Sequence, residues 1–169
     1  MALGVAVERP VKMHENFGFV AGTLVHTKEG LKAIEEVRIG DLLLTFPDDS
    51  TTPDRYRQAN EYTFAKVTKR LTSTACPVMK VVVTGGVRDT FLVTPNHPVY
   101  RERGYKGNNP GWVPFSALEV GEALENCVFG NLLVYRTYVP ETSAEVFNFE
   151  LDTGHTYYVG ENGLWIHSA

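Results

Sequence analysis

The stretch Ile34-Glu-Glu-Val-Arg-Ile-Gly-Asp-Leu-Leu43 recurs 81 residues later as Phe115-Ser-Ala-Leu-Glu-Val-Gly-Glu-Ala-Leu124. Apolar residues match at five positions, one glycine matches, and an acidic residue follows each glycine. A second pair of segments, Asp89–His97 and His155–Gly163, shares Thr, aromatic, Val and Asn residues at an offset of 66. Two matches in the same order favour a real duplication over chance similarity. Two units predict a pseudo-two-fold fold rather than a solenoid, which needs three or more repeats.

The two offsets differ by 15 residues, about the length of the segment Phe46–Asn60. That segment is polar, contains prolines and matches nothing in the second half of the chain. We therefore expect it to be a surface insertion.

The apolar stretches are short and bounded by turn residues, a pattern typical of β-strands. They are Phe19–Val25, Leu42–Phe46, Val78–Val83, Thr90–Val93, Leu132–Val139, Val146–Leu151 and Thr156–Val159. Only Gly30–Ile39 and Val113–Val120 have a spacing that could give a helical turn. The sequence therefore predicts an all-β domain made of two duplicated units.

The composition is that of a globular protein. Of 169 residues, 43% are hydrophobic and 21% are charged, which fits one domain of ordinary size. The net charge of −4 argues against a nucleic-acid-binding face. No membrane-spanning helix is expected, because no apolar run is long enough. No signal peptide is expected either, because the N-terminus lacks a basic region followed by an apolar one. The two cysteines are too few for a disulfide framework or a four-thiolate zinc site.

His97 is the strongest candidate for acid–base chemistry. It lies in a Thr-Pro-Asn-His-Pro turn, where the two prolines restrict the backbone. Thr94 and Asn96 could hydrogen-bond the imidazole and select its tautomer. The same pattern also suits a histidine that merely satisfies a turn. The matching position in the second unit is Gly163, so the fold unit itself does not require a histidine there.

The other histidines and the cysteines give weaker signals. His14 and His26 are expected to be surface residues, and Cys76 and Cys127 to be small buried hydrophobes. His97, His155 and His167 invite a zinc hypothesis, but their spacing matches no compact ligand motif. No metal and no cofactor are therefore expected. The end of the chain alternates as a strand through Trp165-Ile-His167 and should be anchored in the sheet.

Several blocks of the sequence form an ordered series. They are Phe19-Val-Ala-Gly-Thr-Leu-Val25 with Gly40-Asp41, then Thr94-Pro-Asn-His97, then Val146-Phe-Asn-Phe-Glu-Leu151, and finally His155–Gly163 with Trp165-Ile-His167. In this order they resemble the Hint domains of hedgehog proteins and inteins, especially bacterial intein-like and polymorphic-toxin Hint domains. The resemblance implies a minimal Hint domain over 18–168, with flanking segments at 1–17 and 169.

The resemblance also implies a self-processing activity. Such a domain performs an N-terminal acyl shift and then splices or cleaves its own chain. Its partners are its own flanking segments, and a monomer is the family expectation. The domain would be cytoplasmic as expressed, within a host protein that could be secreted.

Individual positions take their roles from the same resemblance. The nucleophile of the acyl shift would stand at Gly18, and His97, with Thr94 beside it, would protonate the departing amide nitrogen. His155 and His167 match the pair that assists cyclisation of a terminal asparagine, whose position Ser168 occupies. Asn148 falls where many inteins carry an aspartate, near the first scissile bond. We expect these residues to meet in one cleft, through pairing of Phe19–Val25 with Trp165–His167.

Gly18 and Ser168 lack the reactive side chains, although the supporting residues remain. This combination favours deliberate replacement, to trap an unprocessed precursor, over natural degeneration, and it predicts that the chain stays uncleaved. Two other functions remain open. One is a non-catalytic β-scaffold within a larger secreted protein. The other is a hydrolase that uses His97 and a metal on an external substrate.

Overall fold

The computed structural model describes residues 11–12, 17–47, 62–102, 109–128 and 130–168, and almost all regular structure in them is β-strand. The strands are β1 Val11–Lys12, β2 Phe19–Val20, β3 Leu24–Thr27, β4 Gly30–Ala33, β5 Leu42–Thr45, β6 Thr63–Thr84, β7 Arg88–Val93, β8 Pro98–Arg101, β9 Gly111–Pro114, β10 Ala123–Leu124, β11 Leu132–Thr137, β12 Thr142–Leu151, β13 Thr156–Val159 and β14 Leu164–His167. The all-β prediction is confirmed.

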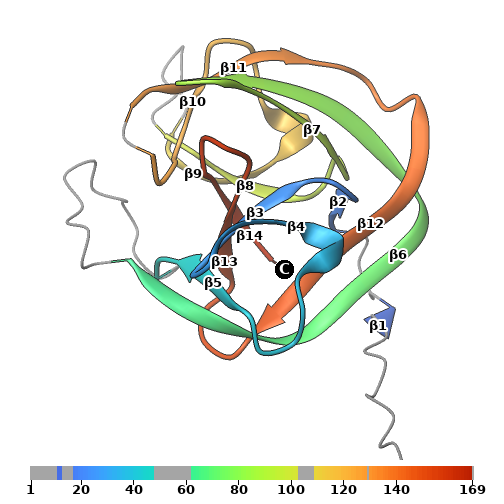
Figure 1. Cartoon of the computed structure of the whole chain (residues 1–169). Helices are drawn as coiled ribbons and strands as arrows, with labels where there is room; N and C mark the ends of the chain where they lie inside the picture. The colour runs from blue at the N-terminus through green and yellow to red at the C-terminus, as the bar shows by residue number, and fades with distance from the viewer. Residues whose placement is uncertain (1–10, 13–16, 48–61, 103–108, 129, 169) are drawn as a thin grey trace, which may run out of the picture.

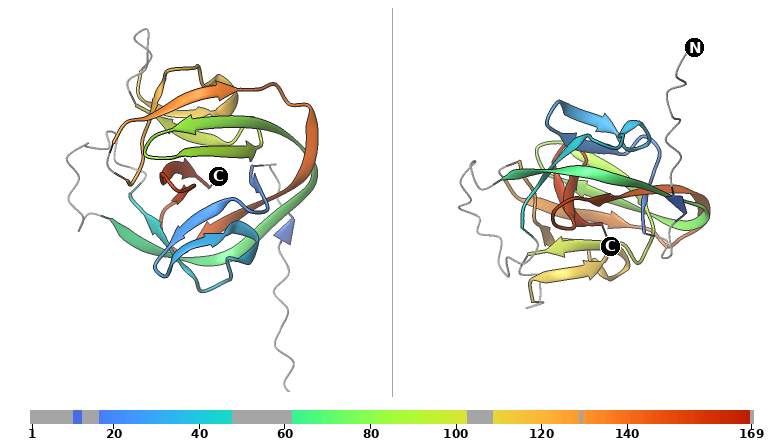
Figure 2. Two further views of the ribbon diagram at one scale, coloured as in Figure 1. Left: turned by 45° about the horizontal axis from the view of Figure 1, so that its top comes forward. Right: turned by 90° about the horizontal axis from the view of Figure 1, so that it is seen from below.

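The two longest strands, β6 and β12, run antiparallel along one side of the molecule, from Thr142 opposite Val78 to Leu151 opposite Val67. β6 also pairs with β5, β7 and β11, so all 14 strands belong to one hydrogen-bonded sheet. Figures 1 and 2 show this sheet curving around β13 and β14, which lie near the centre of the molecule. β14 pairs with β13 on one side and with β8 on the other. The last strand of the domain is therefore enclosed by earlier ones.

The duplication predicted from the sequence is visible in the hydrogen bonds. Both copies contain a 3₁₀ turn, at Ile34–Glu36 and at Phe115–Ala117. In both copies a glycine N–H donates to a strand carbonyl, and the acid after it accepts the N–H of the residue three positions earlier. These bonds are Gly40 to Val67 (2.9 Å) and Arg38 to Asp41 (2.8 Å) in the first copy, and Gly121 to Val134 (2.8 Å) and Glu119 to Glu122 (2.7 Å) in the second.

The second pair of matching segments repeats in the same way. β7 and β13 each end in a turn that a single backbone bond closes. The bond runs from His97 N–H to the Thr94 carbonyl in one turn and from Gly163 N–H to the Gly160 carbonyl in the other, at 3.1 Å in both. The turn that carries His97 is thus a fold element that does not depend on the imidazole.

Some predicted boundaries were wrong. The stretch Phe19–Val25 is not one strand, because the chain turns at Gly22 (φ +89°), whose N–H donates to the Glu35 carboxylate at 2.7 Å. The two helical stretches shrink to single 3₁₀ turns of three residues. Most of the predicted insertion lies outside the described residues. Its first residue, Phe46, is not part of a surface loop but packs edge-on against Tyr62 and Trp165.

The main hydrophobic core joins both copies of the repeat. At its centre the rings of Phe19, Phe91 and Phe115 are at most 2% exposed, and Phe19 contacts each of the other two with ring centroids 5.8 Å apart. Burying a ring of this size stabilises the fold by about 2 to 3 kcal/mol.

In the described ranges, no helix is long and apolar enough to cross a membrane.

Candidate functional site

Gly18 is held in place by Thr94. The Gly18 N–H donates to the Thr94 hydroxyl at 3.1 Å, and the Thr94 N–H donates back to the Gly18 carbonyl at 3.1 Å. Both residues are buried. Because strand β2 starts one residue later and pairs with β7 through Phe19 and Val93, the sheet itself brings position 18 against the turn that carries His97.

A side chain at position 18 would have almost no space. A Cβ built there would lie 2.7 Å from the carbonyl oxygen of Phe147 and 2.9 Å from the Cβ of Val146. The first of these contacts is with backbone of β12, which cannot rotate away as a flexible side chain could. Position 18 is therefore packed for glycine.

His97 lies in an aromatic environment. Its ring is fully buried and contacts Phe17, Phe19 and Phe115, with centroids 6.0, 4.7 and 6.1 Å away. Among the described residues neither ring nitrogen has a hydrogen-bond partner. The expectation that Thr94 and Asn96 orient the ring was wrong. The Thr94 hydroxyl is used by Gly18, and Asn96 is exposed.

Burial lowers the pKa of His97 to about 3, because an apolar environment disfavours the charged ring. His167 has two smaller and opposite effects on the pKa of His97. Its backbone raises this pKa, although it forms no hydrogen bond with the His97 ring, and repulsion from the charge of the His167 ring lowers it. His97 is thus neutral at physiological pH. Its ring can accept one proton at one nitrogen and donate one at the other.

His155 and His167 form a stacked pair at the C-terminal end of the domain. Their rings are nearly parallel, at 13°, with centroids 5.5 Å apart. The pairing of β13 with β14 explains this, because Thr156 stands opposite His167. Trp112 packs edge-on against the His167 ring, with the centroids 5.1 Å apart. His155 is exposed, and His167 is half-buried.

Ser168 is held by its backbone on both sides. Its N–H donates to the His155 carbonyl, and its own carbonyl accepts a hydrogen bond from the Asn148 side-chain amide. The Asn148 side-chain oxygen accepts from the Tyr157 hydroxyl at 2.8 Å and from the Phe149 N–H at 2.9 Å. Asn148 therefore binds the backbone of residue 168 directly, and its neighbour on β12, Phe147, packs against position 18.

Tyr157 and the aromatic residues around His97 were not predicted from the sequence. Tyr157 is fully buried, and burial raises the pKa of its hydroxyl, so it serves as a neutral donor that fixes the Asn148 amide. The sequence offers one indication of this burial: the β13 segment is a short apolar run in which polar and apolar residues do not alternate, as in a strand that is buried on both faces. Nothing in the sequence distinguishes Tyr157 from its neighbour Tyr158.

The structure brings together most of the residues singled out from the sequence. Gly18, Thr94 and His97 form one contact group, and Asn148, His155, His167 and Ser168 form another. The two groups are near enough for His167 to influence the pKa of His97. Asn96 is left out. The predicted pairing of Phe19–Val25 with Trp165–His167 was wrong: β13 lies between them, with Val159 opposite Val25.

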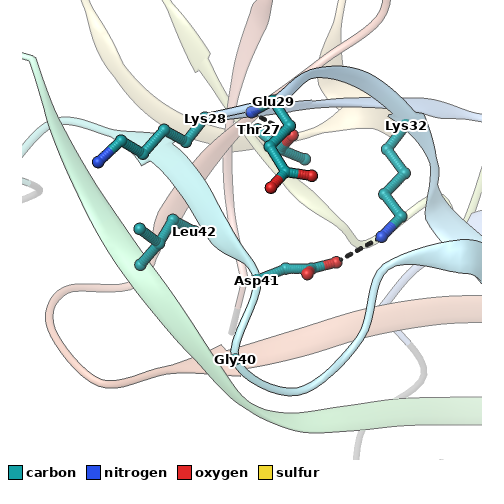
Figure 3. A pocket seen from close by; sticks show the side chains of 7 residues that line it. All are labelled: Thr27, Lys28, Glu29, Lys32, Gly40, Asp41 and Leu42. Atoms are coloured by element: carbon teal, nitrogen blue, oxygen red, sulfur yellow. Dashed lines mark hydrogen bonds and ion pairs between the residues drawn. The ribbon is translucent and has the colours of Figure 1, made fainter.

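Two hollows in the surface lie near this region. One is lined by His155 together with residues from the end of β5 and just after it, from the start of β6 and from the turn before β13: Thr45, Phe46, Pro47, Thr63, Thr153 and Gly154. Of the candidate residues, it contains His155. The other, shown in Figure 3, is lined by residues of β3, β4 and the Gly40–Leu42 turn, where Lys32 Nζ lies 2.8 Å from Asp41. It contains none of the candidate residues.

Two predictions for isolated residues also change. His26 is not a surface residue: it is half-buried, and its Nε2 lies 2.7 Å from the Gly160 carbonyl. Cys76 is buried as expected, but Cys127 is only half-buried, with its sulfur 3.9 Å from His26 Nδ1. His14 lies outside the described residues.

The arrangement can support proton transfer and amide positioning at two backbone sites. His97 is a neutral imidazole whose ring nitrogens have no hydrogen-bond partner in the described part of the chain, and the Asn148 amide holds the carbonyl of residue 168. Within the described ranges, no group of three or more His, Cys, Asp or Glu side chains is arranged to hold a metal ion.

Comparisons with known proteins agree with this geometry. The model of the pretoxin Hint domain family matches residues 24–169. The bacterial intein-like domain from Clostridium thermocellum is similar over 90% of this chain and 99% of its own, with 24% identity and a TM-score of 0.68. A DnaB intein from Synechocystis sp. PCC 6803 covers 91% and 99%, with 14% identity and a TM-score of 0.66. The gp41-1 intein covers 90% and 99%, with 16% identity and a TM-score of 0.61. At these identities the solved structures show a common fold. No curated protein matches the chain.

Proposed function

Because the chain belongs to the pretoxin Hint domain family, we propose that it is a self-processing domain whose reaction is blocked at both chain junctions. The domain would extend over 18–168, and its substrate would be the polypeptide that flanks it on either side. Residues 1–17 and 169 would then belong to those flanks.

One observation carries this proposal. Gly18 and Ser168 lie at opposite ends of the domain, yet both are held against neighbouring residues of β12: position 18 packs against Phe147, and the Asn148 amide binds the carbonyl of residue 168. This arrangement brings the two ends of the domain together. A reaction that joins or cuts the flanking segments requires it, because holding the reacting groups close removes much of the entropic barrier.

The first junction lacks a nucleophile. An acyl shift needs a thiol or hydroxyl that attacks the preceding carbonyl, and glycine has neither. The close approach of the Phe147 carbonyl to position 18 supports a chain adapted to glycine. This packing favours a second candidate function, in which the domain serves as an uncleaved scaffold between its flanks, and it favours natural degeneration over a recent replacement.

The second junction lacks an amide. An asparagine at position 168 could cyclise through its side-chain nitrogen and release the residues after it, whereas the Ser168 hydroxyl cannot form a succinimide. The supporting groups at this junction remain: His155, His167 and the Asn148 amide that holds the residue 168 carbonyl. The Ser168→Asn variant is therefore the informative restoration.

The test is intact-mass spectrometry after long incubation at neutral pH. We expect the unmodified chain to give one mass, with and without added thiol, and Ser168→Asn to lose residue 169. Ser168→Ala is the matched control and should stay intact. A break between Phe17 and Gly18 in the unmodified chain would overturn the proposed block. If Ser168→Asn also stays intact while folded, the scaffold function replaces the processing one.

A further inference from the structure

A cysteine and a histidine meet beside the turn between β13 and β14. The stacked histidines lie at the other end of this hairpin. The Cys127 sulfur lies 3.9 Å from His26 Nδ1, although the two residues are 101 positions apart. Cys127 follows a bridge between Asn126 and Leu164 of β14, and His26 comes from β3. None of the residues at the two chain junctions belongs to this pair.

The hydrogen bonds fix which nitrogen of His26 is a base. The Gly160 carbonyl can only accept, so His26 Nε2, which lies 2.7 Å from it, must carry the proton and donate. In the neutral ring Nδ1 then has a free electron pair, and this pair faces the Cys127 sulfur. A nucleophile beside a base that a third group orients is the usual arrangement of an activated thiol.

The surroundings keep His26 available as that base. Burial lowers the pKa of His26, while the Gly160 carbonyl and the Asp89 carboxylate oppose the shift, so the ring is neutral at pH 7. Asp89 is also held in place, because it accepts N–H bonds from Glu161 and Asn162 at 3.1 and 3.0 Å.

The sulfur occupies a place that only a glycine leaves open. A Cβ built on Gly163 would lie 2.1 Å from the Cys127 sulfur, and the backbone of the two residues is joined by a bond from Cys127 N–H to the Gly163 carbonyl at 2.9 Å. The thiol is therefore seated at a defined point while its residue remains half-exposed. Cys76, which is 1% exposed, has no such access.

The backbone N–H of Cys127 is already hydrogen-bonded, and this favours disulfide exchange over acyl transfer as the reaction of its thiol. In acyl transfer the N–H of the nucleophile itself is a common oxyanion donor, and that of Cys127 is already used by Gly163. Attack on a disulfide sulfur needs no such donor, because the leaving group carries the negative charge.

We propose that Cys127 and His26 form a thiol-modification site that takes low-molecular-weight disulfides. The Cys127 S–H proton passes to His26 Nδ1, and the thiolate attacks one sulfur of the disulfide. The S–S bond of the reagent breaks, a mixed disulfide forms on Cys127, and the departing thiolate leaves as a thiol after taking up one proton. No further oxidant is consumed, and the reaction does not depend on the proposed self-processing function.

The probe is 2,2′-dithiodipyridine, an uncharged disulfide whose released thione absorbs light, applied to the folded full chain at pH 6. An ordinary thiol is well under about 1% ionised at this pH. We expect one equivalent to react, at Cys127 by peptide mapping, while Cys76 stays unlabelled. We expect His26→Gln to slow the reaction by about fivefold. His26 increases the fraction of Cys127 that is ionised by more than about fivefold. The rate changes less than this fraction does, because a thiol with a lower pKa gives a weaker nucleophile.

His26→Gln is a matched variant because a glutamine amide can still donate to the Gly160 carbonyl but offers no base at the Nδ1 position. Cys127→Ser should abolish the fast reaction. A second measurement needs no variant: the rate for the unmodified chain should rise much less than tenfold per pH unit between pH 5 and 7. An unreactive Cys127, an equal rate in His26→Gln, or a full tenfold rise per unit, as for an ordinary thiol, would each overturn the proposal.

Discussion

Acid should destabilise this protein through one buried residue, His97. Replacing it with glutamine, which does not titrate, should remove that part of the pH dependence. In the folded state burial lowers the pKa of His97 to about 3, whereas in the unfolded chain the ring titrates near 6.5. Between these two values the unfolded chain binds the extra proton and the folded protein does not. Stability is therefore complete above pH 6.5 and falls as the pH falls towards 3.

The size of the effect is set by the two pKa values. One unit of difference corresponds to about 1.4 kcal/mol, so the whole window could contribute up to about 5 kcal/mol. At pH 5 the loss relative to pH 7.5 is about 2 kcal/mol. This second figure is the one to test, because it needs only that the folded-state pKa lie well below 5.

The measurement is urea denaturation at pH 7.5 and pH 5, followed by circular dichroism, for the unmodified chain and for His97→Gln. The glutamine costs stability at both pH values, but the pH-dependent loss should be about 2 kcal/mol smaller in the variant. All other ionisable groups are the same in the two proteins, so their contributions largely cancel in the difference. Equal losses in the two proteins would refute the buried, neutral state assigned to His97.

Two further predictions concern packing and hydrogen bonding in the same site. Gly18→Ala should lower the free energy of unfolding by about 1 to 3 kcal/mol, because the added methyl group overpacks the site. The control is Gly86→Ala, whose Cβ would meet only Asn162 at 3.8 Å, and it should be nearly neutral. Equal effects of the two variants in urea denaturation would contradict the tight fit at Gly18. Asn148→Ala should lower the free energy of unfolding by about 2 to 3 kcal/mol, because it leaves the buried Tyr157 hydroxyl without its acceptor. Tyr157→Phe should lower it by about 1 kcal/mol. The reverse order would show that the Asn148 amide is not the centre of this hydrogen-bond network.

The repeated segments were the part of the fold most accessible from the sequence. Each copy contains a positive-φ glycine, Gly40 or Gly121, followed by an acid that caps the turn before it, so local chemistry alone specifies the structure. β13 was also predicted at its observed bounds, because a short apolar run between turns has few other conformations. Such signals depend on residues close in sequence, which is why they can be read without the fold.

Long-range features could not be predicted in the same way. β6 extends over 22 residues, but only Val78–Val83 reads as a strand in the sequence, because Pro77 precedes it and most residues before Pro77 are polar. That polar half is held in the sheet by its pairing with β5 and β12. The environment of His97 depends on Phe19 and Phe115, which reach it through the sheet and not through the turn. The contact between Cys127 and His26 has no sequence signal at all, since neither residue lies in a motif.

The central position of β14 has a consequence for how the protein is made. A ribosome adds residues in order, so Leu164–His167 emerge after every strand that surrounds them in Figure 1. The hydrogen-bond partners β8 and β13 must wait with an open edge until this last strand arrives. His167 and Ser168 reach His97 and Asn148 only at that moment. The two chain junctions therefore cannot meet on a nascent, incomplete domain, and translation itself sets the earliest time at which any chemistry between them could begin.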